Sequence, residues 1–533
     1  MTLKVTTAGI TSQAVESVID QLVADQVASR ITAKDFTLWG KDAEAESSIR
    51  LGWTSSPQDS QTLVNGILAL RDYFTSIGVD RFVLCGMGGS SLAPEVITQT
   101  AGVDLVVLDS TNPEQVGKAL NGDLKRTAVV VSSKSGSTVE TDSQKRLFEE
   151  AFTNAGIDKR DRIVIVTDPG SPMEKAAIAD GYRIFNADPT VGGRYSALTA
   201  FGLVPSGLAG ADIARLLQEA SSAVETLSKD DSTNPGLVLG AVMARTRAGS
   251  AYADKIALVE DGTPIVGLGD WAEQLIAEST GKLGKGVLPV VLGLDAPELI
   301  DKPNDLIIAR LVSDAVTAQA NEVSVSGSLG EQFLLWEYAT VVASRLIGIN
   351  PFDQPDVESA KVAARGMLES REDESSPDFI EGAIEVRTQG FDLQTSADLA
   401  SALRTWLSLA ESDSYVSIHA YLDRIDYPQV VDLRNVLAKV SGRPTTFGWA
   451  PRFLHSTGQY HKGGPAQGIY LQLTSRPVTD IAVPGRDFTL GELIASQASG
   501  DAKVLAEHGR PVLRLTVSDV AEALAQINAS FQE

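Results

Sequence analysis

The sequence predicts an α/β fold with mainly parallel sheets, and three observations support this prediction. Apolar runs rich in β-branched residues alternate with helix-compatible segments from about residue 61 to 205, a pattern typical of parallel sheets covered by helices. A second alternating region begins near residue 235. The chain has 533 residues, of which 43% are hydrophobic, so it can form more than one core.

Three regions precede the C-terminal part of the chain. Residues 1–60 are expected to be mostly helical, because SQAVESVIDQLVADQVASRI has apolar residues at helical spacing. Residues 61–215 are expected to form a first α/β domain, with strands at 82–86, 105–109, 128–132, 163–167 and 182–186. Residues 230–370 are expected to form a second α/β domain, with strands at 255–259, 287–292, 306–311 and 323–325 and helices at 329–346 and 357–369. The two regions indicate a coarse duplication.

The C-terminal region follows a polar, acidic segment, SREDESSPD (370–378), which predicts an exposed connection. Residues 379–533 are expected to form an α/β part that completes the second domain. Its strands are predicted at 415–420, 445–449, 468–473 and 511–517, and its last helix at 520–531.

Two loops rich in small and hydroxyl residues follow predicted strands, in FVLCGMGGSSLAPEV (82–96) and AVVVSSKSGSTVET (128–141). A strand that turns tightly into a helix aims backbone N–H groups and the positive end of the helix dipole at one point. Hydroxyls and a nearby ammonium suit the terminal oxygens of a phosphate monoester. The candidate ligands in the second loop are Ser133, Lys134, Ser135, Ser137 and Thr138. The chain is therefore predicted to bind a phosphorylated small molecule.

Charge and cysteine content exclude several classes of function. The net charge of −24 argues against binding to nucleic acid or to an anionic membrane surface. Cys85 is the only cysteine, which excludes an intramolecular disulfide and a cysteine-based metal site. The N-terminus lacks an apolar signal core and no run is long enough to span a bilayer, so we expect a cytoplasmic protein.

Two further stretches carry groups suited to acid–base chemistry. In DPTVGGRYSALTAFGLVP, two glycines precede Arg194, whose guanidinium could stabilise a developing oxyanion or simply pair with an acidic surface. In LGDWAEQLIAESTGKLGKG, Gln274 and Glu278 share one helix face. Glu278 lies where that helix is expected to end, so it is either a general base or an ordinary solvated carboxylate.

Two later stretches are equally ambiguous when taken alone. GINPFDQPDVESAK places Gln354 at a helix entrance and Lys361 one to two turns into the helix, where a lysine could serve acid–base work or face solvent. WAPRFLHSTGQYHKGGP holds His455 and His461, two of the four histidines. A histidine in such a loop can change protonation near neutral pH, but the spacing is weak support for a metal site.

Together these motifs resemble phosphoglucose isomerase over nearly the whole chain, from about residue 60 to the end. The matching pieces are GMGGSSLAPE, SSKSGSTVET, GGRYSALTAFGL, QLIAESTGK and NPFDQPDVESAK. More closely, the chain resembles the isomerase half of fused transaldolase–isomerase proteins. The resemblance implies two sugar isomerase (SIS) α/β sandwich domains with mainly parallel five-stranded sheets, plus N-terminal helices and a C-terminal α/β part, usually assembled as a homodimer.

The resemblance also implies an activity, which is the interconversion of glucose 6-phosphate and fructose 6-phosphate through a cis-enediol, without metal or organic cofactor. Glu278 would be the base and Arg194 would stabilise the intermediate. Lys361 and a histidine would assist ring opening. The implied substrate-binding residues are Gly89, Ser90, Ser133, Lys134, Ser135, Thr138, Gln274 and Gln354.

One departure from the family pattern concerns the ring-opening histidine, which in the family lies between the base and the lysine. No histidine lies between Glu278 and Lys361 in this chain. Either His455, in HSTGQ, reaches the same place by another chain route, or Gln332 stands where the histidine would be. We expect His455 to take the role.

Two other functions are weighed against the isomerase. A non-catalytic SIS-type regulator that binds sugar phosphates would not need both Glu278 and Lys361. A dinucleotide-dependent oxidoreductase would use the G-x-G of CGMGGSS with Asp109 at the ribose position, but the third glycine is absent and the hydroxyl-rich loop has no role there.

Overall fold

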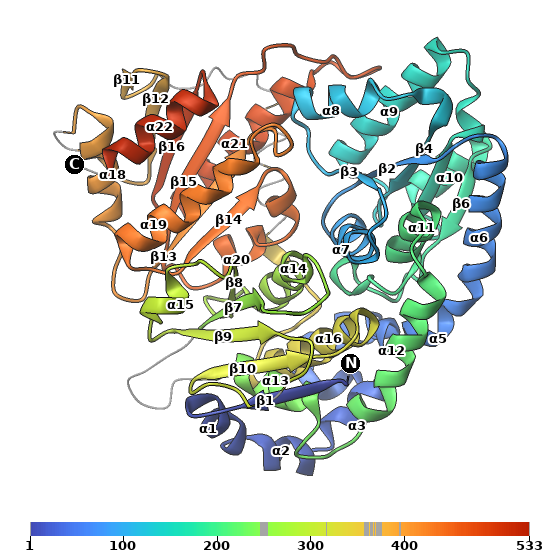
Figure 1. The fold of residues 1–533 in the computed structure, drawn as a ribbon, viewed down its shortest axis with the longest axis vertical. Coiled ribbons are helices and arrows are strands. Elements are labelled where there is room, and N and C mark those ends of the chain that lie inside the picture. The colour runs from blue at the N-terminus through green and yellow to red at the C-terminus, as the bar shows by residue number, and fades with distance from the viewer. Residues whose placement is uncertain are drawn as a thin grey trace.

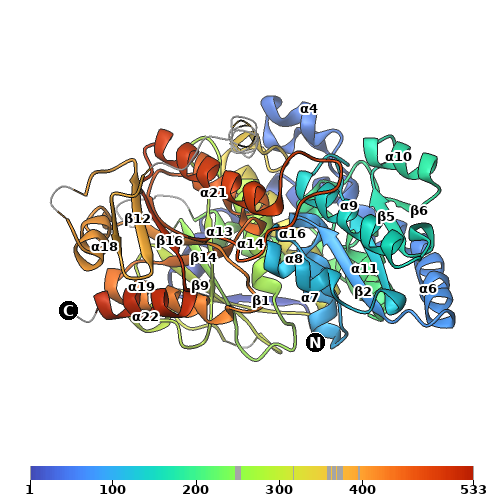
Figure 2. The same ribbon diagram turned by 90° about the horizontal axis from the view of Figure 1, so that it is seen from above.

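The computed structural model describes residues 2–245, 254–315, 317–356, 362, 366, 368, 376–393 and 396–531. Within them, three sheets lie around helices α14 (Leu268–Thr280) and α16 (Leu329–Ile347), as Figures 1 and 2 show. The expected fold class, α/β with mainly parallel five-stranded sheets, is confirmed.

The first sheet has the strand order β3-β2-β4-β5-β6, and all its strands are parallel. They are β2 (Arg81–Gly86), β3 (Val106–Leu108), β4 (Thr127–Ser132), β5 (Ile163–Thr167) and β6 (Arg183–Asn186). The helices around it include α6 (Gln61–Ser76), α7 (Leu92–Ala101), α8 (Pro113–Leu120), α9 (Val139–Asn154), α10 (Pro172–Asp180) and α11 (Ala200–Ala209). The chain runs outward in both directions from the neighbours β2 and β4, so the loops after these strands meet at a topological switch point, where doubly wound sheets bind ligands.

The second sheet repeats this order in β8-β7-β9-β10, which supports the predicted duplication. Its strands are β7 (Lys255–Glu260), β8 (Leu288–Leu292), β9 (Leu306–Leu311), β10 (Glu322–Ser326) and β1 (Lys4–Thr7). The fifth strand, β1, pairs antiparallel with β10. The expectation of a mostly helical N-terminal segment is wrong for these four residues, because their pairing partner lies some 300 positions away and leaves no local signal.

The C-terminal strands form a third sheet of their own, in the order β11-β12-β16-β15-β13-β14, with a separate apolar core. They are β11 (Phe379–Glu381), β12 (Ile384–Gln389), β13 (Tyr415–Tyr421), β14 (Thr445–Trp449), β15 (Gly468–Ser475) and β16 (Val512–Val517). β13 to β16 were predicted within two residues, whereas the antiparallel strands β11 and β12 were not. The domain boundaries stay a prediction.

Helices fill the remaining segments. The N-terminal ones are α1 (Ile10–Glu16), α2 (Ile19–Ala24), α3 (Val27–Thr32), α4 (Glu44–Ser47) and α5 (Ser56–Asp59). Those between and beside the later sheets are α12 (Ile213–Leu227), α13 (Pro235–Met243), α15 (Glu298–Asp301), α18 (Leu399–Leu407), α19 (Leu433–Ser441), α20 (Gly458–Gly463), α21 (Leu490–Glu507) and α22 (Val520–Ser530). Most of the helix predicted at 357–369 and of the connection at 370–378 lies outside the described residues.

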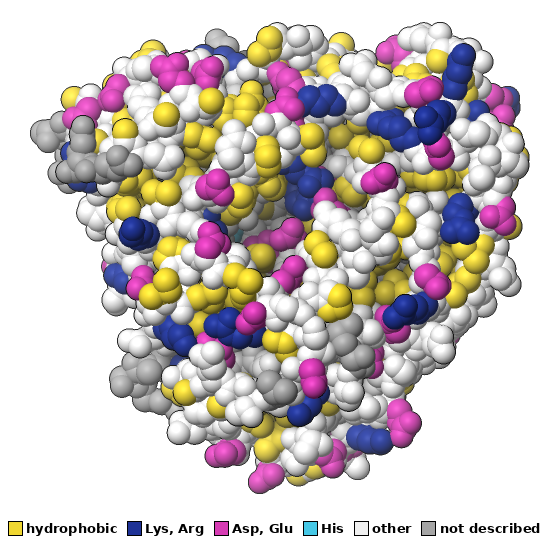
Figure 3. All heavy atoms as spheres, in the orientation of Figure 1, with side chains coloured by type: hydrophobic (Ala, Val, Ile, Leu, Met, Phe, Trp, Pro, Cys, Tyr) yellow, Lys and Arg dark blue, Asp and Glu magenta, His cyan; other side chains and the backbone are white. Residues whose placement is uncertain are grey.

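Ion pairs join the third sheet to the first. Arg452, in the 3-10 turn η9 (Arg452–His455), pairs with Glu95 of α7 and with Asp109, which follows β3. Arg424 Nη1 lies 2.9 Å from Glu95 Oε1. On the face of the molecule drawn in Figure 3, a recess lies between the first and third sheets and contains both basic and acidic side chains. Of the helices in the described part of the chain, none is long and apolar enough to cross a membrane.

Candidate active site

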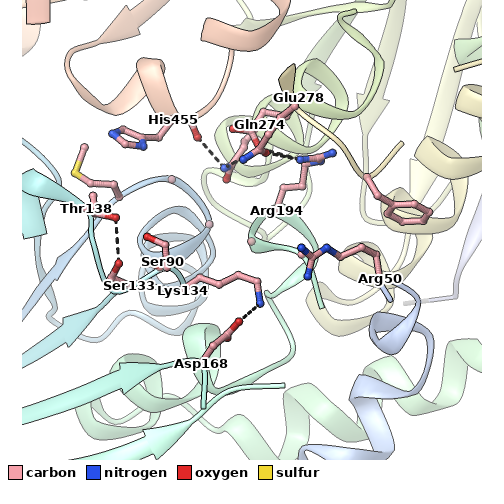
Figure 4. Close-up of a pocket in the computed structure, with 18 of the residues that line it drawn as sticks. Arg50, Ser90, Ser133, Lys134, Thr138, Asp168, Arg194, Gln274, Glu278 and His455 are labelled. Atoms are coloured by element: carbon pink, nitrogen blue, oxygen red, sulfur yellow. Dashed lines mark hydrogen bonds and ion pairs between the residues drawn. The ribbon is translucent and has the colours of Figure 1, made fainter. Parts of the chain in front are cut away.

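A cavity of about 620 Å³ lies beyond the carboxyl ends of β2 and β4. It is lined by residues of both predicted phosphate loops and by Arg194, Gln274, Glu278, Gln354 and His455. Figure 4 shows how Ser133, Thr138, Arg194 and Glu278 surround one space. Groups that are far apart in the sequence are therefore brought to one site.

The first loop runs from β2 through the 3-10 turn η4 (Gly88–Ser90) into α7, and Gly88, Gly89 and Ser90 line the cavity. A Cβ on Gly89 would lie 2.1 Å from the carbonyl oxygen of Gly193. Gly88 has φ +54°, and a Cβ there would lie 2.5 Å from the carbonyl oxygen of His455. Only glycines allow the segments before Arg194 and around His455 to approach this closely.

The second loop, between β4 and α9, supplies hydroxyls. Ser133 Oγ and Thr138 Oγ1 lie 3.0 Å apart, and the backbone N–H of Gly136 donates to Ser133 Oγ at 3.1 Å. Lys134 and Ser135 also line the cavity, and Lys134 Nζ pairs with Asp168. Burial is the main cause that lowers the pKa of Lys134 and raises that of Asp168.

Ser137 is the one candidate of this loop that the structure does not bring to the cavity lining. Its side chain is exposed, and its hydroxyl donates to Ser135 Oγ at 3.1 Å. The sequence could not separate it from its neighbours, because every second residue of SSKSGS is a serine.

Arg194, in the 3-10 turn η7 (Gly193–Tyr195), is 4% exposed and held on all sides. Its Nε donates to Ser279 Oγ at 2.9 Å and its Nη1 to Gln354 Oε1 at 2.7 Å. Its Nη2 donates to the carbonyl oxygens of Pro351 (2.6 Å) and Asp353 (3.0 Å). The guanidinium is thus fixed beside the cavity before any ligand binds.

Glu278 lies beside this guanidinium, with Oε2 3.5 Å from Arg194 Nη1. It is 5% exposed, near the C-terminal end of α14, where the sequence predicts the helix to end. Gln274, one turn earlier, donates to Glu278 Oε2 at 3.4 Å and to the carbonyl oxygen of His455 at 2.8 Å. Gln274 Oε1 is buried and has no partner among the described residues, so it can accept a hydrogen bond from a ligand hydroxyl.

His455 reaches the cavity from the third sheet, and its Nε2 lies 2.9 Å from Glu140 Oε1. Glu140, in the first turn of α9, was not predicted as a site residue, because acidic residues are common in the first turn of any helix. Gln332, the alternative to His455, does not line the cavity; it is buried in α16 and accepts from Trp336 Nε1 at 3.0 Å.

The segment before Lys361 is anchored by a buried lysine that sequence reasoning also missed. Lys282 Nζ donates to the carbonyl oxygens of Asn350 (2.8 Å) and Asp353 (2.6 Å) and lies 2.7 Å from Asp353 Oδ1. Burial, with Arg194 nearby, lowers the pKa of Lys282 to about 8. Lys361 itself lies outside the described residues.

A further cation, Arg50, lines the cavity from the N-terminal segment. Its Nε lies 2.7 Å from Glu46 Oε1, and its Nη1 donates to the carbonyl oxygen of Pro189 at 3.1 Å. The isolated bridge Leu51↔Val191 ties it to the segment that carries Arg194. Nothing in the sequence near Arg50 indicates this contact.

The arrangement places an anion-binding loop and a buried carboxylate–guanidinium pair in one cavity. The loop can hold a phosphate, while the carboxylate can move a proton and the guanidinium can stabilise negative charge on oxygen. No group of three His, Cys, Asp or Glu side chains suited to a metal ion occurs in the described ranges.

Comparisons with known proteins point to sugar phosphate isomerases. A family model described as phosphoglucose isomerase matches residues 72–243. A probable glucose-6-phosphate isomerase of Haloarcula marismortui is 28% identical over 365 residues, which cover 58% of this chain and 81% of the relative. A glucose-6-phosphate isomerase of Thermus thermophilus is 37% identical over 187 residues, which cover 34% of this chain and 44% of the relative.

Solved structures share the fold. A hypothetical protein from Thermus thermophilus has a TM-score of 0.60 at 25% identity, covering 69% of this chain and 100% of that chain. A glucose-6-phosphate isomerase from Chlamydia trachomatis has a TM-score of 0.51 at 20% identity, covering 66% of this chain and 79% of that chain. The closer resemblance to fused transaldolase–isomerase proteins stays a prediction.

Proposed function

The chain is a member of the phosphoglucose isomerase family, and on that premise we propose that it interconverts glucose 6-phosphate and fructose 6-phosphate. The observation that carries the proposal is that the Ser133–Thr138 loop and Glu278 line one cavity. A hexose held at one end by its phosphate then presents its carbonyl end to the carboxylate.

In the proposed reaction, the loop hydroxyls and backbone N–H groups hold the phosphate while the sugar ring opens. As the C1–O5 bond breaks, protonated His455 gives a proton to the ring oxygen and the C1 hydroxyl loses one, and Lys361 is the second group that the family resemblance assigns to this step. Glu278 takes the proton from C2 of the open aldose and returns it to C1. Proton exchange between the two oxygens completes the ketose, so no external oxidant is consumed.

Arg194 stabilises the negative charge that develops on oxygen in the enediol intermediate. Because four hydrogen bonds and one ion pair already fix its guanidinium, little reorganisation accompanies the reaction. Binding of the distant phosphate contributes orientation to the same step.

The test is the Glu278→Gln variant, in an assay for fructose 6-phosphate formed from glucose 6-phosphate. Loss of general base catalysis lowers kcat by about 10²–10⁴-fold. Exposed Glu225, on α12 and remote from the cavity lining, offers a matched control in Glu225→Gln. Near-wild-type turnover in Glu278→Gln would reject Glu278 as the base.

The alternative, a non-catalytic sugar phosphate regulator, is not favoured, since the relatives are named as isomerases. Purified protein that binds glucose 6-phosphate without converting it would revive that alternative. We also propose a homodimer in the cytoplasm, which rests on the family resemblance and is tested by light scattering and by fractionation of the source cells.

A further inference from the structure

A buried glutamine of helix α21 contacts Glu140, the partner of His455. Gln497, in the middle of α21, is 4% exposed, and its Nε2 donates to Glu140 Oε1 at 2.7 Å. The same oxygen lies 2.9 Å from His455 Nε2. Glu140 Oε1 therefore has two nitrogen partners. One belongs to His455, the proposed ring-opening residue, and the other to Gln497, which lies outside the cavity lining.

A threonine sets which way the Gln497 amide points. Thr111 Oγ1 lies 3.0 Å from Gln497 Oε1, and an amide oxygen can only accept, so the hydroxyl is the donor. The amide NH₂ must then face Glu140. The chain Thr111–Gln497–Glu140–His455 links the end of the first sheet, α21, α9 and η9.

This order of donors and acceptors determines the state of the imidazole. An ionised carboxylate only accepts, so Nε2 of His455 carries the hydrogen that faces Glu140 and Nδ1 is the nitrogen left for other partners. The hydrogen bond from Gln497 favours the ionised form of Glu140, since it is a donor to a charged acceptor.

We propose that Gln497 is a positioning residue of the isomerase, which holds Glu140 so that His455 presents Nδ1 to the ring oxygen of the substrate. This inference rests on the proposed function for its kinetic part. The other charged groups that line the cavity with His455 are Glu46, Arg50, Lys134, Asp168, Arg194, Glu278 and Asp353. Arg452, in the same 3-10 turn as His455, is paired with Glu95 and Asp109.

Two variants separate positioning from simple packing. Gln497→Met removes the donor at similar volume, and Gln497→Glu replaces it with a second carboxylate. Gln472→Met is the matched control, because Gln472, in β15, is also buried and does not line the cavity. It too has two hydrogen bonds: its Nε2 donates to the carbonyl oxygen of Ala498, and its Oε1 accepts from Arg514 Nε.

The first readout is independent of catalysis. With only four histidines in the chain, ¹⁵N-histidine labelling resolves the imidazole nitrogens, and His455→Asn assigns the signal. We expect the Nε2–H form of His455 in the parent protein, a mixture of tautomers in Gln497→Met, and an imidazole that stays protonated to higher pH in Gln497→Glu. Unchanged His455 signals in both variants would overturn the proposal.

The second readout is kinetic. Loss of one hydrogen bond to a charged group should lower kcat/KM for glucose 6-phosphate roughly tenfold in Gln497→Met. Gln497→Glu should shift the pH profile of kcat/KM toward higher pH, because an added negative charge favours the protonated imidazole. An equal loss in Gln472→Met, or wild-type profiles in both Gln497 variants, would contradict the proposal. If the parent protein itself does not isomerise, the proposed function fails while the tautomer measurement still tests Gln497.

Discussion

The two ends of the cavity are built in different ways. At the phosphate end, hydroxyls and backbone groups of one short loop, Ser133–Thr138, act together and remain partly open to solvent. At the other end, Arg194, Glu278, Gln354 and His455 come from four separate segments and are joined by direct hydrogen bonds or ion pairs to buried neighbours. The proposed binding of the anion depends on local sequence, whereas the proposed acid–base chemistry depends on long-range packing.

The largest expected effect is at the reacting end. Arg194→Met should lower kcat by about 10²–10³-fold with a smaller change in KM, since it removes a donor aimed at developing charge. Steady-state kinetics measure the two constants separately. Arg215→Met is the control for loss of a guanidinium, because the Arg215 side chain, on α12, is exposed. A rise in KM alone would place Arg194 with the binding groups instead.

The phosphate end should respond in the opposite way. Ser133→Ala removes a cavity-lining hydroxyl that we propose binds the phosphate, so we expect KM to rise about tenfold while kcat changes little. Ser137→Ala is a sharp control, because Ser137 belongs to the same loop but not to the cavity lining. Equal rises in KM for the two variants would mean that substrate binding depends on the loop as a whole and not on the hydroxyls that line the cavity.

Arg50 tests whether a positive charge near the phosphate end lowers KM through its electric field alone, without a direct contact with the substrate. Burial and Asp168 dominate the pKa of Lys134, but Arg50 is also among the charges that lower it, so its field reaches the loop. Arg50→Met should raise KM several-fold at low salt, and the difference should shrink near 1 M salt, where screening acts within about 3 Å. Lys41→Met, exposed on the same N-terminal segment, removes an equal charge and should leave KM unchanged.

The smallest effect concerns pH and Lys282. Its pKa of about 8 in the fold is below the usual 10.5, so deprotonation above pH 8 weakens the ion pair with Asp353 that anchors the segment around Gln354. Activity should therefore fall about twofold from pH 8 to 9. Stability should change in the opposite direction to activity. Between pH 8 and 10.5 the Lys282 side chain binds more protons in the unfolded chain than in the fold, so its contribution to the free energy of unfolding rises with pH.

Lys282→Arg, which stays charged, should remove this alkaline decline from the profile of kcat. Thermal unfolding across the same pH range measures the effect of Lys282 on stability separately from its effect on activity. A decline that persists in Lys282→Arg would assign the titration to another group.

The contrast between the two ends also explains what could be predicted from sequence. The phosphate loops follow strands directly, so local spacing predicted them. Spacing also put Gln274 and Glu278 on one helix face, but only the family resemblance assigned them roles. Glu140, Gln497 and Lys282 look like ordinary helix or loop residues, and their contacts depend on segments more than 60 positions away. The same reason hides β1, whose partner is β10.

The ion pairs of Arg452 have a consequence for how the molecule could be divided. A fragment that ended before the third sheet would lack Arg452 and Arg424, the two cations that pair with Glu95 and Asp109. Complementary halves mixed in one tube should therefore recover solubility and turnover together, and neither half should do so when kept apart.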